Sequence, residues 1–334
     1  MRSGRDRILD GRRSGGFGFL VATAPRPDTD SGAPRARLMS RTLFQTAVFV
    51  TLLMLYFIGV PLSGADATVV ACAAILLVGL PHGALDLEII KGDRGTGPAG
   101  MVAVLMLYLG LAAAMMAIWS SAPVAALAIF IVVAVVHFAE DWRELRSAFL
   151  AQGMAIALLT APALLHLTEL ERLFVALSGQ SEAALVANIM LLLAPVSIAV
   201  ASVSLWTLWH GGSRDQAAVG VLTLAGMIVL PPVIGFALFF CLYHSPHHFA
   251  LATARVGAGS RARWVVLFVS LAALGIAVAL FASEMRGGVT AQAVAASFMT
   301  LSLLTVPHMI VPAIASAIAA WRARLAGACG ATAR

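Results

Sequence analysis

The chain has 334 residues, of which 60% are hydrophobic and only 11% are charged. This composition excludes an ordinary soluble globular domain, in which about a quarter of the residues are charged. The net charge of +6 does not indicate a nucleic-acid-binding protein, because the basic residues lie in an N-terminal tail and in short segments between apolar runs, where anionic lipid head groups are the expected partner.

Residues 1 to 41 are predicted to form a disordered, Arg-rich cytoplasmic extension. They carry nine Arg and four Asp among many Gly, Pro and Ser, and such a composition cannot bury enough apolar surface to fold alone. The rest of the chain is predicted to be a single transmembrane helical domain over residues 42 to 322, followed by a cytoplasmic tail over residues 323 to 334.

Ten apolar runs follow the extension. They span approximately residues 43 to 63, 66 to 90, 98 to 119, 121 to 142, 147 to 166, 183 to 209, 216 to 232, 233 to 253, 264 to 284 and 291 to 320. Each is expected to cross roughly 30 Å of hydrocarbon at about 1.5 Å per residue. Pro231 and Pro232 separate the seventh run from the eighth, because adjacent prolines resist helix continuation. The sequence therefore predicts an all-α, polytopic integral membrane protein with about ten transmembrane helices.

The basic residues predict the orientation of these helices. With ten crossings, every Lys and Arg except Arg172 and Arg286 falls on one side, in the extension, the tail or short loops. The side of a membrane protein that is rich in Lys and Arg faces the cytoplasm. Both termini are therefore expected to be cytoplasmic.

Six of the eight histidines are expected at a common depth in the membrane. They occupy the second halves of the predicted second, fourth, eighth and tenth helices: His82, His137, His244, His247, His248 and His308. Ionisable groups are costly inside a bilayer, so their presence there indicates a functional site.

The spacing of these residues predicts a metal site. An aspartate follows His82 and another follows His137 by four residues, and His244 and His248 are also four apart, which places each pair on one helix face. Imidazole is a ligand for Fe, Zn, Cu and Ni, and a carboxylate can orient the ring and offset the charge of the ion. The predicted ligands are His82, His137, His244 and His248, with Asp86 and Asp141 behind them.

The remaining residues near this depth have several interpretations. His308 is interpreted as a ligand, a donor behind the ligands or a pocket wall. The candidates for a substrate pocket are Phe236, Phe240, Tyr243, His247 and Met309. For the aromatic residues among them, the alternative is contact with lipid or with another helix.

Four motifs in chain order carry a family resemblance. They are Pro-His-Gly-Ala-Leu-Asp at 81 to 86, His-Phe-Ala-Glu-Asp at 137 to 141, Tyr-His-Ser-Pro-His-His at 243 to 248 and Pro-His-Met at 307 to 309. Over about residues 45 to 320 the chain resembles the Brp/Blh family of β-carotene 15,15′-dioxygenases. Position 247 departs from the family pattern, in which Arg is common.

The resemblance implies an activity and its cofactor. Members of this family are integral membrane enzymes that use Fe(2+) and O2 to cleave the central double bond of β-carotene into two molecules of all-trans-retinal. The family's iron ligands map onto His82, His137, His244 and His248. The resemblance also implies a bacterial inner membrane location and a functional link to a retinal-binding rhodopsin.

Three other functions compete with this one. A membrane di-iron desaturase or hydroxylase of a lipid or carotenoid is suggested by the H-x-x-H-H pattern of residues 244 to 248, but two metals need more ligands than the chain's isolated His82 and His137 add. A transporter would distribute its polar groups across the membrane. A retinal-binding protein with a Schiff base would need a lysine in a helix, and Lys91 is expected in a loop.

Overall fold

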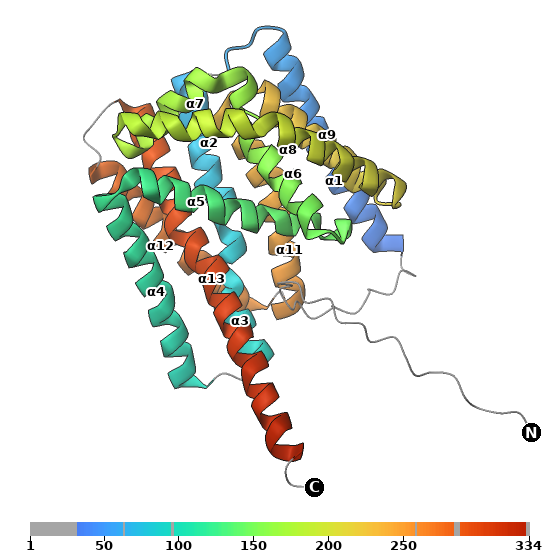
Figure 1. Ribbon diagram of the computed structural model, residues 1–334, viewed down its shortest axis with the longest axis vertical. Helices are drawn as coiled ribbons and strands as arrows, with labels where there is room; N and C mark the ends of the chain where they lie inside the picture. The colour runs from blue at the N-terminus through green and yellow to red at the C-terminus, as the bar shows by residue number, and fades with distance from the viewer. Residues whose placement is uncertain (1–31, 63, 95–96, 258, 284–287, 332–334) are drawn as a thin grey trace, which may run out of the picture.

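The computed structural model describes residues 32–62, 64–94, 97–257, 259–283 and 288–331, and within these ranges the chain forms helices and turns without a strand (Figure 1). The first half contains α1 (Gly32–Phe57), α2 (Ala65–Ala74), η1 (Ile75–Gly79), η2 (Leu80–Leu85), α3 (Asp86–Arg94), α4 (Pro98–Ser121), α5 (Pro123–Phe138), η3 (Ala139–Leu145), α6 (Ala148–Thr160) and α7 (Ala163–Ser178). The second half contains η4 (Ser181–Ala183), α8 (Ala184–His210), α9 (Arg214–Val229), α10 (Pro232–Leu238), η5 (Phe239–His244), α11 (Ser245–Val256), α12 (Ser260–Ser283) and α13 (Val289–Ala331). The all-α prediction is confirmed.

Among the described residues, fewer helices are long and apolar enough to cross a membrane than the ten predicted. In the described residues, six helical stretches are long and apolar enough to cross a membrane: Ala65–Gly92, Pro98–Ser121, Pro123–Leu145, Ser181–His210, Ala262–Ala282 and Val289–Ile318. The pair α6 and α7, bent by 65°, adds a seventh if it is counted as one span. The count of ten is therefore not confirmed, although the protein is an integral membrane protein by these helices.

The difference has a physical reason. The 13 residues of α6 and the 16 residues of α9 reach only about 20 and 24 Å at 1.5 Å per residue, short of the roughly 30 Å of a hydrocarbon core. The predicted span at 233 to 253 is divided into α10, η5 and α11. Residues 1 to 31 of the predicted extension lie outside the described residues. Its last residues, 32 to 41, belong to α1, which begins at Gly32.

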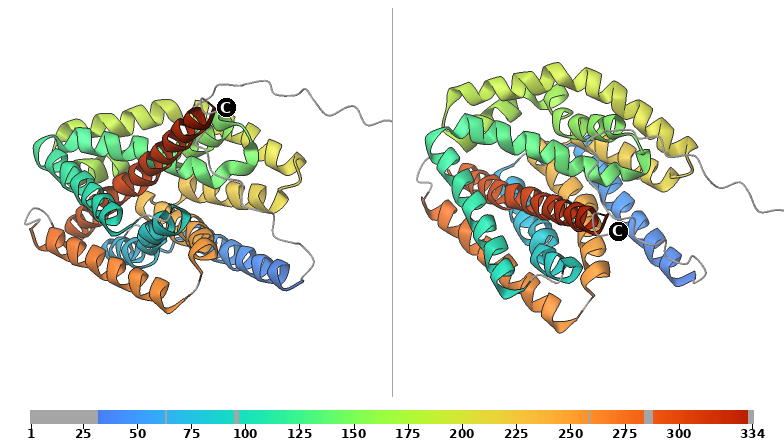
Figure 2. Two further views of the ribbon diagram at one scale, coloured as in Figure 1. Left: turned by 90° about the horizontal axis from the view of Figure 1, so that it is seen from below. Right: turned by 60° about the horizontal axis from the view of Figure 1, so that its bottom comes forward.

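The long helix α13 connects most of the molecule. It contacts α2, α4, α5, α7 and α12. In Figure 1 its C-terminal part extends past the other helices, on the side that is turned forward in the right-hand view of Figure 2. Inside the structure, Nε1 of Trp119 on α4 donates a hydrogen bond of 2.8 Å to Oγ of Ser302 on α13. Both groups are buried, and a buried N–H of this kind needs such a partner.

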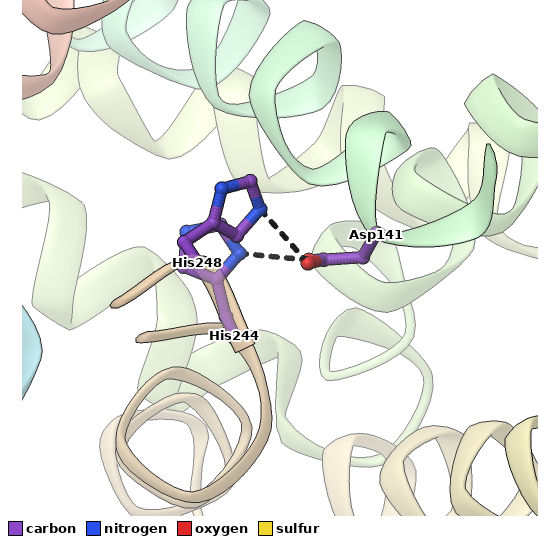
Figure 3. A group of neighbouring side chains, drawn as sticks. All are labelled: Asp141, His244 and His248. Atoms are coloured by element: carbon purple, nitrogen blue, oxygen red, sulfur yellow. Dashed lines mark hydrogen bonds and ion pairs between the residues drawn. The ribbon is translucent and has the colours of Figure 1, made fainter. Parts of the chain in front are cut away.

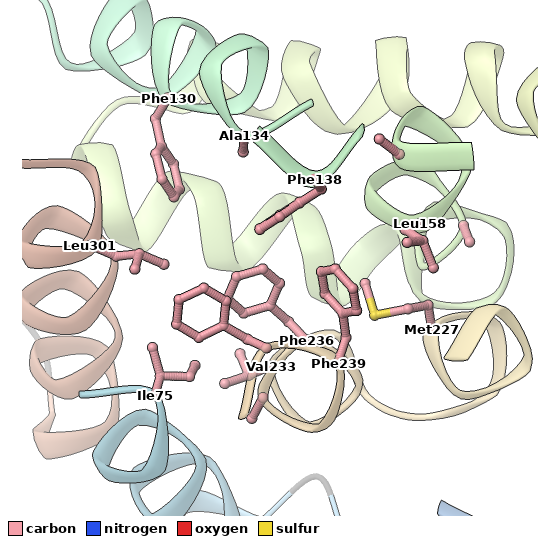
Figure 4. Packing of buried hydrophobic residues seen from close by; sticks show 14 of the residues in the cluster. Ile75, Phe130, Ala134, Phe138, Leu158, Met227, Val233, Phe236, Phe239 and Leu301 are labelled. Carbon is pink, nitrogen blue, oxygen red and sulfur yellow. The ribbon is translucent and has the colours of Figure 1, made fainter. Parts of the chain in front are cut away.

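Aromatic residues fill the core between α5, α10 and η5 (Figure 4). The ring of Phe138 lies edge-on to Phe239, with 4.9 Å between centroids. Phe236 stacks on Phe240 at 5.5 Å. All four rings are buried, and their mutual contacts add to the stabilisation from burial. This aromatic core lies directly beside the histidines described below.

The helices depart from α geometry where the predicted ligands are located. A π-turn, η1, and a 3-10 turn, η2, follow α2; the 3-10 turn η3 follows α5; and the π-turn η5 precedes α11. Such turns change which side chains share a face and leave carbonyl groups in need of donors. π-turns inside longer helices are frequent at functional sites.

Polar side chains and one glycine stabilise these irregular turns. Oγ of Ser245 donates to the carbonyl oxygens of Val78 and Gly79, at 3.0 and 2.9 Å, and Nε2 of Gln45 donates to the carbonyl of Leu242. At position 79 a Cβ atom would lie 2.1 Å from Cε1 of Phe240. Only glycine therefore lets η1 and η5 approach this closely.

Candidate metal centre

Three of the predicted ligands come together in the structure; two of them, His244 and His248, are drawn with Asp141 in Figure 3. His137 lies near the end of α5, His244 at the end of η5, and His248 one turn later in α11. The ring centroid of His137 lies 4.6 Å from that of His244 and 5.2 Å from that of His248. The Nε2 atoms of His137 and His244 are 3.0 Å apart. The end of α5 and the continuous η5–α11 segment, more than 100 residues apart in the chain, thus bring their imidazole rings into contact.

Asp141 holds two of these rings. Its Oδ2 lies 2.7 Å from Nδ1 of His244, and its Oδ1 lies 3.1 Å from Nε2 of His248. The carboxylate is buried, and it accepts the ring N–H of each histidine. With Nδ1 of neutral His244 as a donor, Nε2 carries the lone pair that a metal requires. Asp141, His244 and His248 form a group whose ligand atoms all lie within 4.8 Å of one another.

The partners of Asp141 differ from the expectation based on spacing. In a regular α-helix, Asp141 shares a face with His137, but its carboxylate contacts His244 and His248. The reason lies in η3, which begins at Ala139. A 3-10 turn has three residues per turn instead of 3.6, so the side chain of Asp141 is rotated away from the i+4 position. His248 also presents Nε2 to Asp141. Because a carboxylate oxygen of Asp141 lies close to both histidines, Asp141 is itself a candidate ligand.

A second carboxylate, that of Asp86, holds His308. Oδ2 of Asp86, at the start of α3, lies 2.5 Å from Nδ1 of His308 on α13. The hydroxyl of Tyr108 on α4 donates to the same oxygen. The His308 ring lies edge-on to His137, with 5.0 Å between centroids. His308 therefore belongs to the histidine cluster, and a carboxylate orients it in the way that Asp141 orients His244.

The side chain of His82 lies outside the described residues. Its backbone belongs to η2 (Leu80–Leu85). At the next residue, Gly83, a Cβ atom would lie 3.1 Å from Nδ1 of His308. The turn that carries His82 therefore contacts the cluster, and its role as a ligand stays a prediction.

These residues fit a divalent transition metal. Imidazole nitrogens with carboxylates are the ligand set that Fe, Zn, Cu and Ni accept. The two carboxylates, Asp86 and Asp141, supply two negative charges, which offset a divalent ion in a site of low dielectric. The surrounding aromatic residues exclude water: Phe138 and Phe240 lie 4.8 and 5.4 Å from the His244 ring, centroid to centroid. The cluster is thus a candidate metal centre.

The predicted pocket residues occupy different places. Phe236 lines an apolar cavity, and Phe240 stacks on His244 with the ring planes 14° apart. Tyr243 is buried and stacks on Trp142 of η3, at 5.5 Å. His247 is exposed and parallel to Tyr243. Met309 is half-buried beside His308 on α13.

Sequence reasoning missed Tyr108 and Gln216. Tyr108 contacts Asp86 from a different helix, and Nε2 of Gln216 on α9 donates a 2.8 Å hydrogen bond to the carbonyl of Asp141. The sequence could have indicated Tyr108, because it is the one side chain with a hydroxyl group in the apolar run at 98 to 119. A buried tyrosine hydroxyl normally has a hydrogen-bond partner.

The comparisons with known proteins decide the family. The profile of the family described as Beta-carotene 15,15'-dioxygenase matches residues 73–315, which is most of the chain. The chain belongs to the β-carotene 15,15′-dioxygenase family. The predicted resemblance is confirmed, and this member of the family is a carotenoid-cleaving dioxygenase. The matched region includes the three motifs at 81 to 86, 137 to 141 and 243 to 248, as well as His308.

Two curated relatives agree with this membership. The chain is 28% identical over 260 residues to the "Beta-carotene 15,15'-dioxygenase" of the uncultured marine bacterium 66A03, covering 72% of this chain and 90% of the relative. It is 28% identical over 312 residues to the "Probable beta-carotene 15,15'-dioxygenase Blh" of Halobacterium salinarum, covering 80% of this chain and 88% of the relative. No solved structure matches the chain.

Proposed function

We propose that this dioxygenase uses ferrous iron and O2 to cleave the central double bond of β-carotene into two molecules of all-trans-retinal. The observation that carries the proposal is the cluster of His137, His244, His248 and His308, held by two carboxylates in a chain of this family. We include His82 among the ligands, with Asp86 and Asp141 as the groups that orient the rings and balance the charge.

The chain's own residues prepare the reaction. Asp141 orients His244 and His248, and Asp86 orients His308, so the rings do not have to reorganise when the ion binds. Phe138 and Phe240 lie against the ring of His244 and exclude water from the cluster. Bound ferrous iron supplies the redox chemistry that makes O2 reactive towards a carbon–carbon double bond.

The reaction balances without an external reductant. The central C=C bond breaks, and each of its two carbons becomes the carbonyl carbon of one retinal by gaining one atom of O2. The role of the protein is therefore to hold the polyene with this bond beside the histidines, and positioning of this kind supplies much of the selectivity of an enzyme. We place the enzyme in a bacterial inner membrane, with an even number of crossings and both termini cytoplasmic. Its product would serve a retinal-binding rhodopsin.

Expression of the full chain in bacteria that accumulate β-carotene tests the proposal. We expect loss of colour and the appearance of retinal or retinol by chromatography, with near one iron per purified chain. His137→Ala and His244→Ala are expected to abolish cleavage, because they remove imidazoles from the centre of the cluster. Retained β-carotene in cells that contain the wild-type, iron-loaded protein would contradict the activity. Near two irons per chain would favour the desaturase or hydroxylase alternative.

A further inference from the structure

An apolar cavity lies beside the metal centre. Residues of α5, α7, α8, α9, α10 and α13 contribute to its wall, together with Leu159 and Pro162 beside the α6–α7 bend. Every lining side chain is Leu, Ile, Val, Ala, Met, Phe or Pro. Small-molecule sites are usually lined by apolar side chains, with a few polar groups for orientation. A wall with no polar side chain selects a ligand that is hydrocarbon over the length of the cavity.

One face of α5 leads from the cavity to the histidines. Leu127, Phe130 and Ala134 line the cavity and are spaced by three and four residues, so they lie along one helix face. The next residue on this face is His137, whose ring belongs to the cluster. At 1.5 Å per residue, Leu127 and His137 are about 15 Å apart along the helix axis. Among the α5 residues that line the cavity, Leu127 is therefore the one farthest from His137 along the helix.

Stacked rings connect the near end of the cavity to the cluster. Phe236 lines the cavity, Phe240 stacks on Phe236 with the planes 13° apart, and His244 stacks on Phe240 with the planes 14° apart. Phe138 lies against all three rings. Aromatic faces are suited to contact with a conjugated chain. The cavity and the metal centre are thus neighbours, with the rings of Phe138 and Phe240 between them.

We infer that this cavity holds one cyclic end of the carotenoid and the polyene attached to it, and that its depth selects the bond that is cleaved. The inference rests on the proposed function. A conjugated polyene is rigid, so the depth that its end ring reaches fixes which double bond lies beside the histidines. Leu127, the lining residue of α5 farthest from His137, is then the residue that determines the position of cleavage.

Substitutions at Leu127 test the inference in the full-length enzyme. Leu127→Phe shortens the cavity, and Leu127→Ala deepens it. With β-carotene as substrate, we expect the ratio of off-centre apocarotenals to retinal to rise roughly tenfold or more, the discrimination that about one methylene confers in a hydrophobic pocket. Val132→Phe is the matched control, because Val132 is on the same helix and exposed; it is expected to keep the wild-type product.

Each outcome has a distinct meaning. Off-centre products, or lost cleavage with the iron content retained, support the inference. If Leu127→Phe loses iron as well, the helix is disturbed and Leu127→Ala decides. Retinal alone at the wild-type rate from both variants overturns the assignment of the cavity and leaves the proposed function intact. A wild-type enzyme that forms no retinal contradicts the proposed function instead.

Discussion

Oδ2 of Asp86 lies 2.5 Å from Nδ1 of His308, although 222 residues separate the two in the chain. Tyr108 donates its hydroxyl to the same carboxylate oxygen. The start of α3, the middle of α4 and the proline-containing part of α13 therefore meet at one carboxylate. This contact fixes the orientation of the His308 ring relative to His137.

Tyr108→Phe is expected to weaken metal binding about 10- to 100-fold, the usual effect of losing a group that orients a ligand. The phenyl ring keeps the packing of α4, so thermal stability should change little. Metal retained after a chelator challenge measures the effect, with Tyr56→Phe as the control on α1. Equal metal retention in the two variants would show that the tyrosine hydroxyl does not position His308.

The adjacent histidines of α11 provide an internal comparison. His248→Ala removes a ring that contacts Asp141 and is expected to lower iron occupancy and cleavage by at least about tenfold. His247→Ala is expected to keep both, because the His247 side chain is exposed and stacks on Tyr243 outside the cluster. Iron analysis of the two purified proteins measures this. If His247→Ala has the larger loss, the two rings have been assigned the wrong roles.

Asp141→Asn keeps the shape of the side chain but removes its charge. One end of the amide is a donor, so Asn cannot accept a ring N–H from both His244 and His248. We expect an iron affinity about 10- to 100-fold lower. Glu140→Gln is the control: Glu140 pairs with Arg143 at 2.9 Å in a partly exposed position, and such a pair contributes at most about 1 kcal/mol. Similar iron affinities for both variants would contradict the proposed role of Asp141.

Gly79→Ala tests the close approach of η1 and η5. The new Cβ would lie 2.1 Å from Phe240, and overpacking of this kind destabilises a protein by about 1–3 kcal/mol. Displacement of Phe240, which stacks on His244, should also reduce cleavage. Gly110→Ala has nothing within 4 Å of its Cβ and is expected to be neutral or slightly stabilising. Thermal unfolding in detergent compares the two, and equal midpoints would refute this account of Gly79.

Sequence reasoning predicted the membership of the cluster better than its contacts. Spacing and depth selected His137, His244 and His248, because a face of a helix can be read from a period of 3.6 residues. The partners of Asp141 could not be read in this way, because η3 departs from that period. Tyr108 was missed because its partner lies across helices.

The number of membrane crossings could not be derived from hydropathy alone. The apolar run at 147 to 166 includes the bend between α6 and α7, and both halves pack into the protein interior. Buried helices of a membrane protein are as apolar as helices that face lipid, so composition does not distinguish them. In the described part of the chain, the length and bending of the helices leave six or seven stretches that could cross a membrane, compared with the ten predicted.

The π-turn η5 aligns the cavity-lining ring of Phe236 with the histidine cluster. In a regular α-helix, each step of four residues rotates the side chain by roughly 40° about the helix axis, so residues at i, i+4 and i+8 do not stay in line. The wider π-turn compensates for this rotation and keeps Phe236, Phe240 and His244 in one stack. Deleting a single residue from 239 to 244 would restore α-helical geometry. The cavity-lining ring of Phe236 and the ring of His244 would then no longer point to the same side of the helix. Related enzymes that share this alignment must therefore conserve the length of the segment as well as its histidines.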